Sequence, residues 1–134
     1  MRFEFEVSSK TKAEFVDITE KVQSCVRQCG VHSGVCVVFV PHTTAGVMVN
    51  EHADPSVVAD IATQLDVMVP QHRNYRHLEG NSPAHIKATL VGDSETLFIE
   101  DGKLVLGTWQ GIFFSEFDGP RNRNVLVKIV PDKP

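Results

Sequence analysis

The sequence predicts an α+β domain with about three helices and a mostly antiparallel sheet. Near both ends of the chain, apolar residues alternate with polar ones, which is typical of half-buried strands. Three internal segments carry apolar residues at helical spacing behind a capping residue or a proline. The resulting order is two strands, a helix, two strands, two helices and then a run of hairpins. This order is typical of the α+β class.

The first forty residues are expected to form a hairpin, a helix and a buried strand. Residues 3–7 and 13–16 place apolar side chains at period two on either side of a polar turn. Thr19 is expected to cap a helix that ends at Gly30. Residues 34–40 are continuously apolar, which predicts a central strand covered on both faces. The buried stripe expected for the helix is Val22, Cys25, Val26 and Cys29.

Two further helices are predicted on either side of a polar loop. A short strand at 45–50 leads to Asp54-Pro55, a capping residue followed by proline at the first helical position. This helix precedes a surface loop at 71–81. A Ser-Pro pair then starts a helix at Ser82 that ends at Gly92. The buried stripe expected for the longer helix is Val57, Val58, Ile61, Leu65 and Met68.

The last forty residues read as strands joined by tight turns. Asp101-Gly102 is a strong hairpin turn, and a second turn is expected at 118–120. The strands predicted around these turns are 96–100, 104–110, 111–117 and 125–130.

Composition and charge bound the classes of function. The 134 residues are expected to form a single domain, 1–134, and the net charge of -4 offers no basic face for nucleic acid. The longest apolar run, 35–40, is too short to cross a membrane, and the opening residues lack the pattern of a signal peptide. We therefore expect a cytoplasmic protein. The three cysteines form no CxxC pair and suggest neither a disulfide framework nor a zinc ribbon.

Histidines carry the main functional signal of the sequence. Five of the six lie between positions 42 and 85, interspersed with acidic residues and an asparagine. Neutral imidazoles on several segments can bind a metal, and His42, His52 and His85 are the candidate ligands. Histidine ligands suit zinc better than magnesium, which prefers oxygen donors. Spacing alone leaves this interpretation and ordinary surface histidines equally supported.

Other polar residues have both a functional and a local interpretation. Glu51 is a candidate general base, or it caps the end of a strand. Thr43 and Thr44 can bind an anion through their hydroxyl groups, or close a turn. Arg121 can bind phosphate or pair with Asp118. Trp109 lies between two glycines, and the sequence alone favours a hairpin with a buried tryptophan.

Three blocks of sequence resemble the signature blocks of the YjbQ-like family. They are HTTAGVMVNEHADP, YRHLEGNSPAHIKA and LGTWQGIFFSEFDGPR, in that order. The resemblance covers almost the whole chain, and none of the signature positions is substituted. It implies a sheet folded as a sandwich or half-barrel, assembly as a homotrimer, and a pocket at or near the subunit boundary where the blocks meet. Positions such as His72 and the region of Arg123 are expected to lie at the surface.

The resemblance also implies a function. Some members of the family are credited with thiamine-phosphate synthase activity, which joins a pyrimidine pyrophosphate to a thiazole phosphate and releases pyrophosphate. A small phosphorylated metabolite and a divalent metal, zinc or magnesium, would then bind in the pocket. Metal-dependent hydrolysis and non-catalytic metabolite binding are the alternatives. The expected catalytic residues are Glu51, Asn81 and Arg121, and the expected substrate-binding residues are Thr43, Thr44, Lys87, Trp109 and Gln110.

Overall fold

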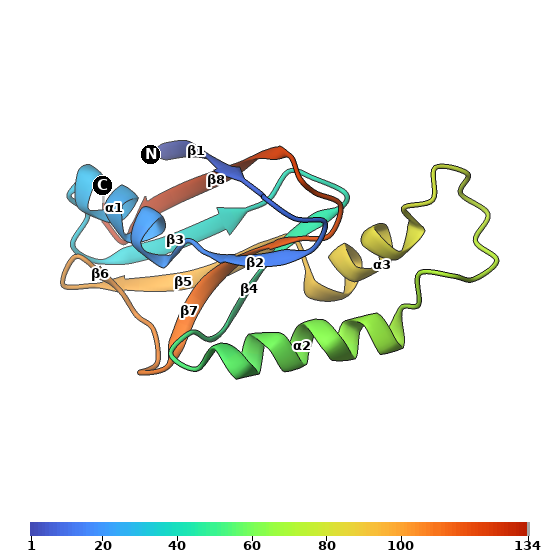
Figure 1. Ribbon diagram of the computed structural model, residues 1–134. Coiled ribbons are helices and arrows are strands. Elements are labelled where there is room, and N and C mark those ends of the chain that lie inside the picture. Colours follow the sequence, from blue (N-terminus) through green and yellow to red (C-terminus); the bar gives the residue numbers. More distant parts are fainter. Residues whose placement is uncertain (134) are drawn as a thin grey trace.

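The computed structural model describes residues 1–133 and contains three helices and eight strands in that range (Figure 1). The elements are β1 Arg2–Ser8, β2 Glu14–Asp17, α1 Thr19–Cys29, β3 Gly34–Phe39, β4 Ala45–Glu51, α2 Pro55–Met68, α3 Ser82–Val91, β5 Ser94–Glu100, β6 Lys103–Leu104, β7 Gln110–Glu116 and β8 Asn122–Pro131.

Two antiparallel sheets confirm the predicted α+β class. The larger sheet has the order β1-β8-β3-β5-β6, and the smaller has the order β2-β7-β4. The strand predicted to be central, β3, is the middle strand of the larger sheet, paired with β5 and β8. The hairpin turn at Asp101 and Gly102 is also confirmed, because both residues have positive φ and the turn joins β5 to β6.

The predicted hairpin of the first two strands is wrong. β1 pairs with β8, whereas β2 pairs with β7 in the other sheet. Alternation identifies a strand but not its partner, and the turn between β1 and β2 crosses from one sheet to the other. The same applies to β7 and β8, which belong to different sheets although a short turn joins them. Of the predicted strand 104–110, only Leu104, in β6, and Gln110, in β7, lie in strands.

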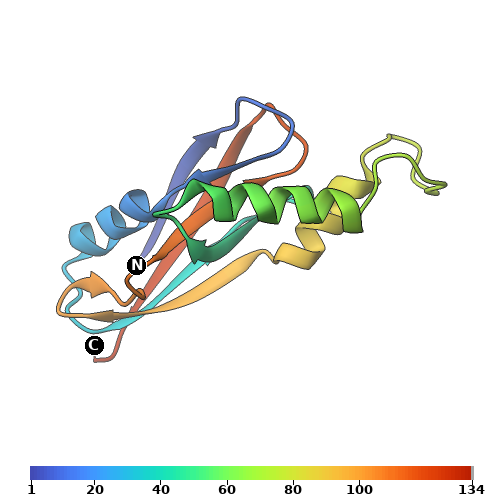
Figure 2. The ribbon, with the colours of Figure 1, turned by 60° about the horizontal axis from the view of Figure 1, so that its bottom comes forward.

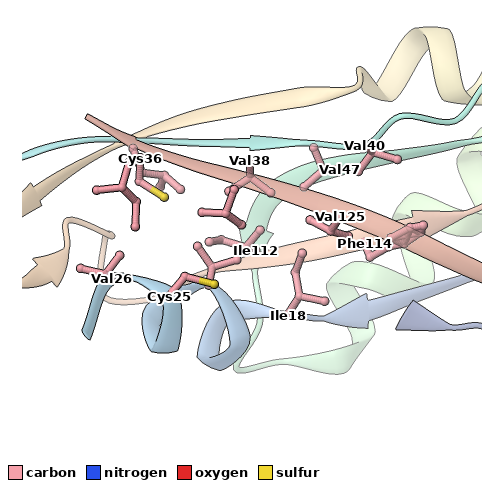
Figure 3. Packing of buried hydrophobic residues seen from close by; sticks show 14 of the residues in the cluster. Ile18, Cys25, Val26, Cys36, Val38, Val40, Val47, Ile112, Phe114 and Val125 are labelled. Carbon is pink, nitrogen blue, oxygen red and sulfur yellow. The ribbon is translucent and has the colours of Figure 1, made fainter. Parts of the chain in front are cut away.

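The core lies between the two sheets and α1. Inward-facing residues from both sheets are fully buried, among them Val38, Val125 and Phe114. Figure 3 shows Cys25 and Val26 directed from α1 toward the strand that carries Cys36 and Val38. Burial raises the pKa of the Cys36 thiol to about 12, so this thiol stays protonated and unreactive at neutral pH.

The helix ends follow the sequence signals in part. Gly30 ends α1 in the left-handed conformation, as predicted, but Ile18 occupies the N-cap position instead of Thr19. Asp17 compensates by accepting the backbone N–H of Thr19 at 2.9 Å. Asp54 caps α2 as predicted. At α3 the N-cap is Asn81, one residue before the predicted Ser82.

The predicted stripe of α2 is only partly buried. Val57, Val58, Ile61 and Leu65 are half-buried, no residue of α2 is fully buried, and Met68 is 57% exposed. Figures 1 and 2 show α2 running along the outside of the small sheet, with the loop 71–81 extending away from the rest of the chain. The rest of this chain therefore covers the apolar stripe only in part. Within residues 1–133, no helix has the length and apolar character needed to span a bilayer.

Candidate functional site

Two adjoining cavities lie where the β3–β4 connection, α3 and the β7–β8 turn approach one another. Their volumes are about 570 Å³ and 460 Å³, and four residues line both. We call this combined space the His42–His85 pocket. The residues common to both cavities are His42, Thr43, His85 and Asp93, and the larger cavity is also lined by Thr44, Glu79, Asn81, Arg121 and Arg123.

His42 is held as a neutral ring in one tautomer. Its Nε2 accepts the backbone N–H of Asn124 at 2.9 Å, so Nε2 is unprotonated and the ring hydrogen is on Nδ1. Burial lowers the pKa of His42, and the positive charges of Arg123 and Arg121 lower it further. Its Nδ1–H is therefore left as a hydrogen-bond donor. Nε2 is not free to bind a metal or to accept a proton while this hydrogen bond is present.

His85 lies in the first turn of α3, close to the position expected from the sequence. It is the fourth residue of the helix and packs edge-on against His77, with ring centroids 5.4 Å apart. The amino end of a helix carries partial positive charge, which favours a nearby anion. His85 therefore lies where its ring can form a hydrogen bond with a ligand.

Asn81 and Arg121 meet at Asp118. Asp118 accepts hydrogen bonds from Asn81 Nδ2 at 3.0 Å and from Arg121 at 2.7 Å. Burial opposes the charged carboxylate, but these hydrogen bonds and the Arg121 charge outweigh it and lower the pKa of Asp118. Asn81 Oδ1 is buried and has no partner among residues 1–133. Arg121 thus pairs with Asp118 as one interpretation predicted, while half of its side chain remains exposed beside the pocket.

A buried ion pair forms one wall of the pocket, and sequence analysis missed it. Arg123 was expected at the surface but is only 4% exposed, and its guanidinium makes two hydrogen bonds to the fully buried Glu116. It also donates to the Thr44 hydroxyl at 2.8 Å, while Ser9 donates to Glu116 at 2.7 Å. Thr44 is buried by these contacts, whereas Thr43 is exposed. The pair and its hydrogen bonds therefore connect the β1–β2, β3–β4 and β7–β8 turns at the pocket.

Four of the remaining predicted residues lie at the opposite end of β4. Glu51, His52, Trp109 and Gln110 cluster there, roughly 20 Å from the pocket for a strand of this length. His52 Nδ1 lies 2.8 Å from Asp17 Oδ2, and its ring leaves no space for a Cβ at Gly111. Trp109 is 62% exposed, which contradicts the buried tryptophan that the sequence favoured. We call this group the His52 cluster.

The three predicted metal ligands do not form one site within a chain. His42 and His85 line the pocket, but His52 lies in the other cluster. Across residues 1–133, no three His, Cys, Asp or Glu side chains are grouped closely enough to hold a metal ion. Because Nε2 of His42 is already hydrogen-bonded, the residues of a single chain do not fit the predicted metal.

Lys87 is also outside the pocket. It lies two residues from His85 on α3, and this spacing turns its side chain to another face of the helix. There its ammonium forms an ion pair with Asp66 of α2. Within a single chain, Lys87 therefore does not line the His42–His85 pocket beside Arg121.

Comparison with known proteins identifies the family. The sequence profile described as UPF0047 protein YjbQ-like matches residues 3–132. The chain belongs to the YjbQ-like UPF0047 family. It is 53% identical to a UPF0047 protein of Methanocaldococcus jannaschii, over 99% of this chain and 96% of that protein. It is 43% identical to UPF0047 protein YugU of Bacillus subtilis, over 93% and 96%.

Solved structures of YjbQ-like proteins share the fold. An uncharacterised YjbQ/UPF0047 family protein from Clostridium acetobutylicum matches with a TM-score of 0.94 at 53% identity, covering 96% of this chain and 99% of that one. A YbjQ-like protein of unknown function from Sulfolobus solfataricus has a TM-score of 0.94 at 36% identity, covering 98% and 97%. These descriptions establish the family and its fold but name no reaction, so function has to be argued from the site.

Sequence signals for the missed residues of this YjbQ-like chain exist but are weak. Glu116 and Arg123 occupy strand positions whose neighbours two residues away are apolar and buried, so the alternation marks both side chains as inward-facing. An acidic and a basic residue at inward positions of nearby strands can be interpreted as a buried pair. No comparable signal marks Asp17 as the partner of His52, because only the pairing of β2 and β4 with β7 brings them together.

Proposed function

We propose that the His42–His85 pocket binds a small phosphorylated metabolite. The observation that carries the proposal is the tautomer of His42, whose Nδ1–H is a donor supported by the Asn124 hydrogen bond. Arg121 contributes guanidinium donors at the same pocket, and Thr43 contributes a hydroxyl. Donors of this kind favour a group that only accepts hydrogen bonds, such as phosphate.

The pocket also contains groups that would accept hydrogen bonds from a ligand. Glu79 and Asp93 line it together with the donors, and Asn81 stands beside them. A ligand that combines phosphate oxygens with N–H groups would therefore match the pocket better than phosphate alone. An aminopyrimidine pyrophosphate has both features, which supports the thiamine-phosphate synthase reaction implied by the family resemblance.

In that reaction the residues of the pocket would act on the leaving group. Displacement of pyrophosphate from the pyrimidine CH₂ group by the thiazole nitrogen breaks a C–O bond and forms a C–N bond. Negative charge then builds on the departing pyrophosphate. Arg121 and the Nδ1–H of His42 would stabilise this charge, and His85 would form a hydrogen bond with it. Asn81 would orient the pyrimidine.

We further propose that copies of the chain assemble as a homotrimer in the cytoplasm, with the pocket at the subunit boundary. Uncovered apolar surface supports assembly: α2 buries none of its residues, and Phe98 on the outer face of the large sheet is 65% exposed. Phe98 of β5 pairs with Val35 of β3, and Val35 pairs on its other side with the exposed Val130 of β8. A neighbouring copy would bring its His52 cluster to the pocket and so unite Glu51, Trp109 and Gln110 with His85. A metal would then bind to His52 and His85 of two chains.

Binding of inorganic pyrophosphate, measured by isothermal titration calorimetry, tests the ligand class. We expect Arg121→Gln to weaken binding about tenfold or more, because a charge-assisted hydrogen bond is lost. The exposed Arg76, on the 71–81 loop, provides the control Arg76→Gln. Equal affinity of the Arg121→Gln and parent proteins would sink the proposal. Synthase activity is assayed separately with the two phosphorylated precursors.

Shared pockets are tested by mixing variants. If His52 of one chain serves the pocket of another, His52→Ala and His85→Ala proteins are each inactive, but trimers assembled from both regain part of the activity. Mixed trimers contain pockets with both native histidines only when the two residues come from different chains. Activity that stays absent in verified mixed trimers would contradict a pocket shared between His52 of one chain and His85 of another.

A further inference from the structure

A third cavity lies on the other side of α3 from the His42–His85 pocket. Its volume is about 340 Å³, at the lower end of the range for small-ligand sites. Residues of α3 that line it differ from those that line the pocket, and at 100° per residue they occupy a separate face of the helix. We call it the Lys12–Lys87 cavity. Its principal residues are Lys12, Asp66, Val69, Pro83, Lys87 and Phe117.

The inner wall of this cavity is apolar and fixed. Val69, Ala84 and Phe117 are all buried, and Phe117 packs edge-on against Phe15 with ring centroids 6.0 Å apart. Beside this wall lies α2, whose Leu65 is half-buried against the cluster of Ala84, Ala88 and Phe117. A cavity remains between α2 and α3, and apolar side chains border it. An apolar group placed there would remove both surfaces from water.

Two ammonium groups border the same space. The Lys87 side chain is only 12% exposed, which is unusual for lysine, and its one ion-pair partner in residues 1–133 is the exposed Asp66. Lys12 reaches the cavity from the turn between β1 and β2, where its ammonium contacts Gln71 at 3.4 Å. With one carboxylate for two ammonium groups, the cavity carries an excess positive charge.

We propose that the Lys12–Lys87 cavity binds a small organic anion with a short apolar body and a carboxylate or phosphate head. The head would lie between the two ammonium groups, and the body would rest on Val69 and Phe117. This site is separate from the phosphorylated-metabolite pocket and does not depend on it, since the two share no residue.

The test uses four probes that separate head from body. Hexanoate and hexyl phosphate carry both parts, whereas hexanol has only the body and inorganic phosphate only the head. Binding is followed by chemical shifts of the backbone amides of Ala84 and Phe117 in the full chain. We expect saturable shifts with hexanoate or hexyl phosphate at concentrations at least about tenfold lower than with either partial probe. The better of the two complete probes identifies the head group.

Variants locate the site. We expect Lys12→Gln, on an exposed turn, and Lys87→Met each to weaken binding about tenfold, because each removes one charge. Lys128→Gln, on the outer face of the large sheet, is the matched control. Lys12→Gln carries the test if Lys87→Met does not fold. Binding that is unchanged in both variants, or hexanol binding as tightly as hexanoate, would overturn the proposal.

The two proposed ligand sites can be tested independently of each other. Arg121→Gln is expected to leave hexanoate binding unchanged, and Lys12→Gln is expected to leave pyrophosphate binding unchanged. Loss of hexanoate binding in Arg121→Gln would move the probe to the His42–His85 pocket and overturn the second site. No saturable shift with either complete probe would also overturn it, whatever the result with pyrophosphate.

Discussion

Glu116 and Arg123, both buried, face each other across the base of the β7–β8 turn and are joined by two hydrogen bonds. Burial alone would raise the pKa of Glu116, but the hydrogen bonds from Arg123 and Ser9 outweigh it and lower the pKa. The carboxylate is therefore charged inside the protein, and its charge depends on Arg123. Because Arg123 also holds Thr44, this pair links the stability of the fold to the shape of the pocket.

Removing one member of this pair is expected to be costly. Arg123→Met leaves Glu116 buried without its charged partner, and we expect the free energy of unfolding to fall by about 3–5 kcal/mol. Urea unfolding measures it. Arg121→Met, on a half-exposed side chain, is the control and should cost less than about 1 kcal/mol. Similar losses in the two variants would mean that the buried pair contributes no more than a surface pair.

The contact between His52 and Gly111 can be tested by adding a methyl group at Gly111. A Cβ on Gly111 would lie 2.3 Å from Nδ1 of His52, so Gly111→Ala must displace the ring. We expect a loss of about 1–3 kcal/mol in stability, as for other overpacked sites. His52→Ala in the same chain should restore most of it. Gly107→Ala, which meets only the side chain of Gln110, is the control. A Gly111→Ala chain as stable as the parent would show that the ring moves freely.

Acid should weaken the fold in two steps. The folded-state pKa of His42 is below its ordinary 6.5, so the unfolded chain binds more protons in this window and stability falls as pH drops below 6.5. Glu116 has a lowered pKa, and its contribution is lost only below its ordinary 4.5. Unfolding by urea at about pH 7.5 and 5.5 isolates the first step.

His42→Gln is expected to flatten that first step, because glutamine does not titrate and its side-chain oxygen can still accept the Asn124 N–H. His72→Gln, on the exposed loop, controls for loss of a histidine. If both variants keep the full pH dependence of the parent, His42 is not its source.

The uncovered sheet face predicts how assembly can be broken. Phe98→Lys places a charge in the apolar row with Val35 and Val130, and we expect it to reduce the molecular mass measured by sedimentation to that of smaller species. Glu4→Lys, on β1 at the charged edge of the same sheet, is the control. A trimer that persists in Phe98→Lys would direct attention to α2 as the interface. A monomeric parent protein would contradict the assembly proposal itself.

Local signals predicted most of the elements. The Asp54 cap, the Gly30 terminus and the turn at Asp101 depend on neighbouring residues alone, so the sequence was sufficient to find them. The partners of β1 and β2 were predicted incorrectly, because pairing is decided by contacts with residues 96 to 126 positions away. The burial of α2 was overestimated for a related reason: an apolar stripe indicates which side chains favour burial, but not how completely the same chain buries them.

Reliance on neighbouring residues also explains why the candidate site was predicted only in part. Polar residues near one connection, such as His42 and Thr43, did fall in the pocket, and Arg121 joined them through the β7–β8 turn. Glu51 and His52 were grouped with them by closeness in sequence. An extended strand, however, carries residues only a few positions apart to opposite ends of a small domain. The tautomer of His42 was beyond reach, since it depends on a backbone N–H from β8.

The exposed position of α2 has a consequence for the dynamics of an isolated chain. The side chains of α2 are at most half-buried, so tertiary packing holds this helix less firmly than α1 and it can open without the core opening. Its amide hydrogens would then exchange with solvent faster than those of α1, whose Val22 and Val26 are fully buried. Assembly that covers α2 would slow this exchange. The exchange rate of the α2 amides would thus report the extent to which chains are associated.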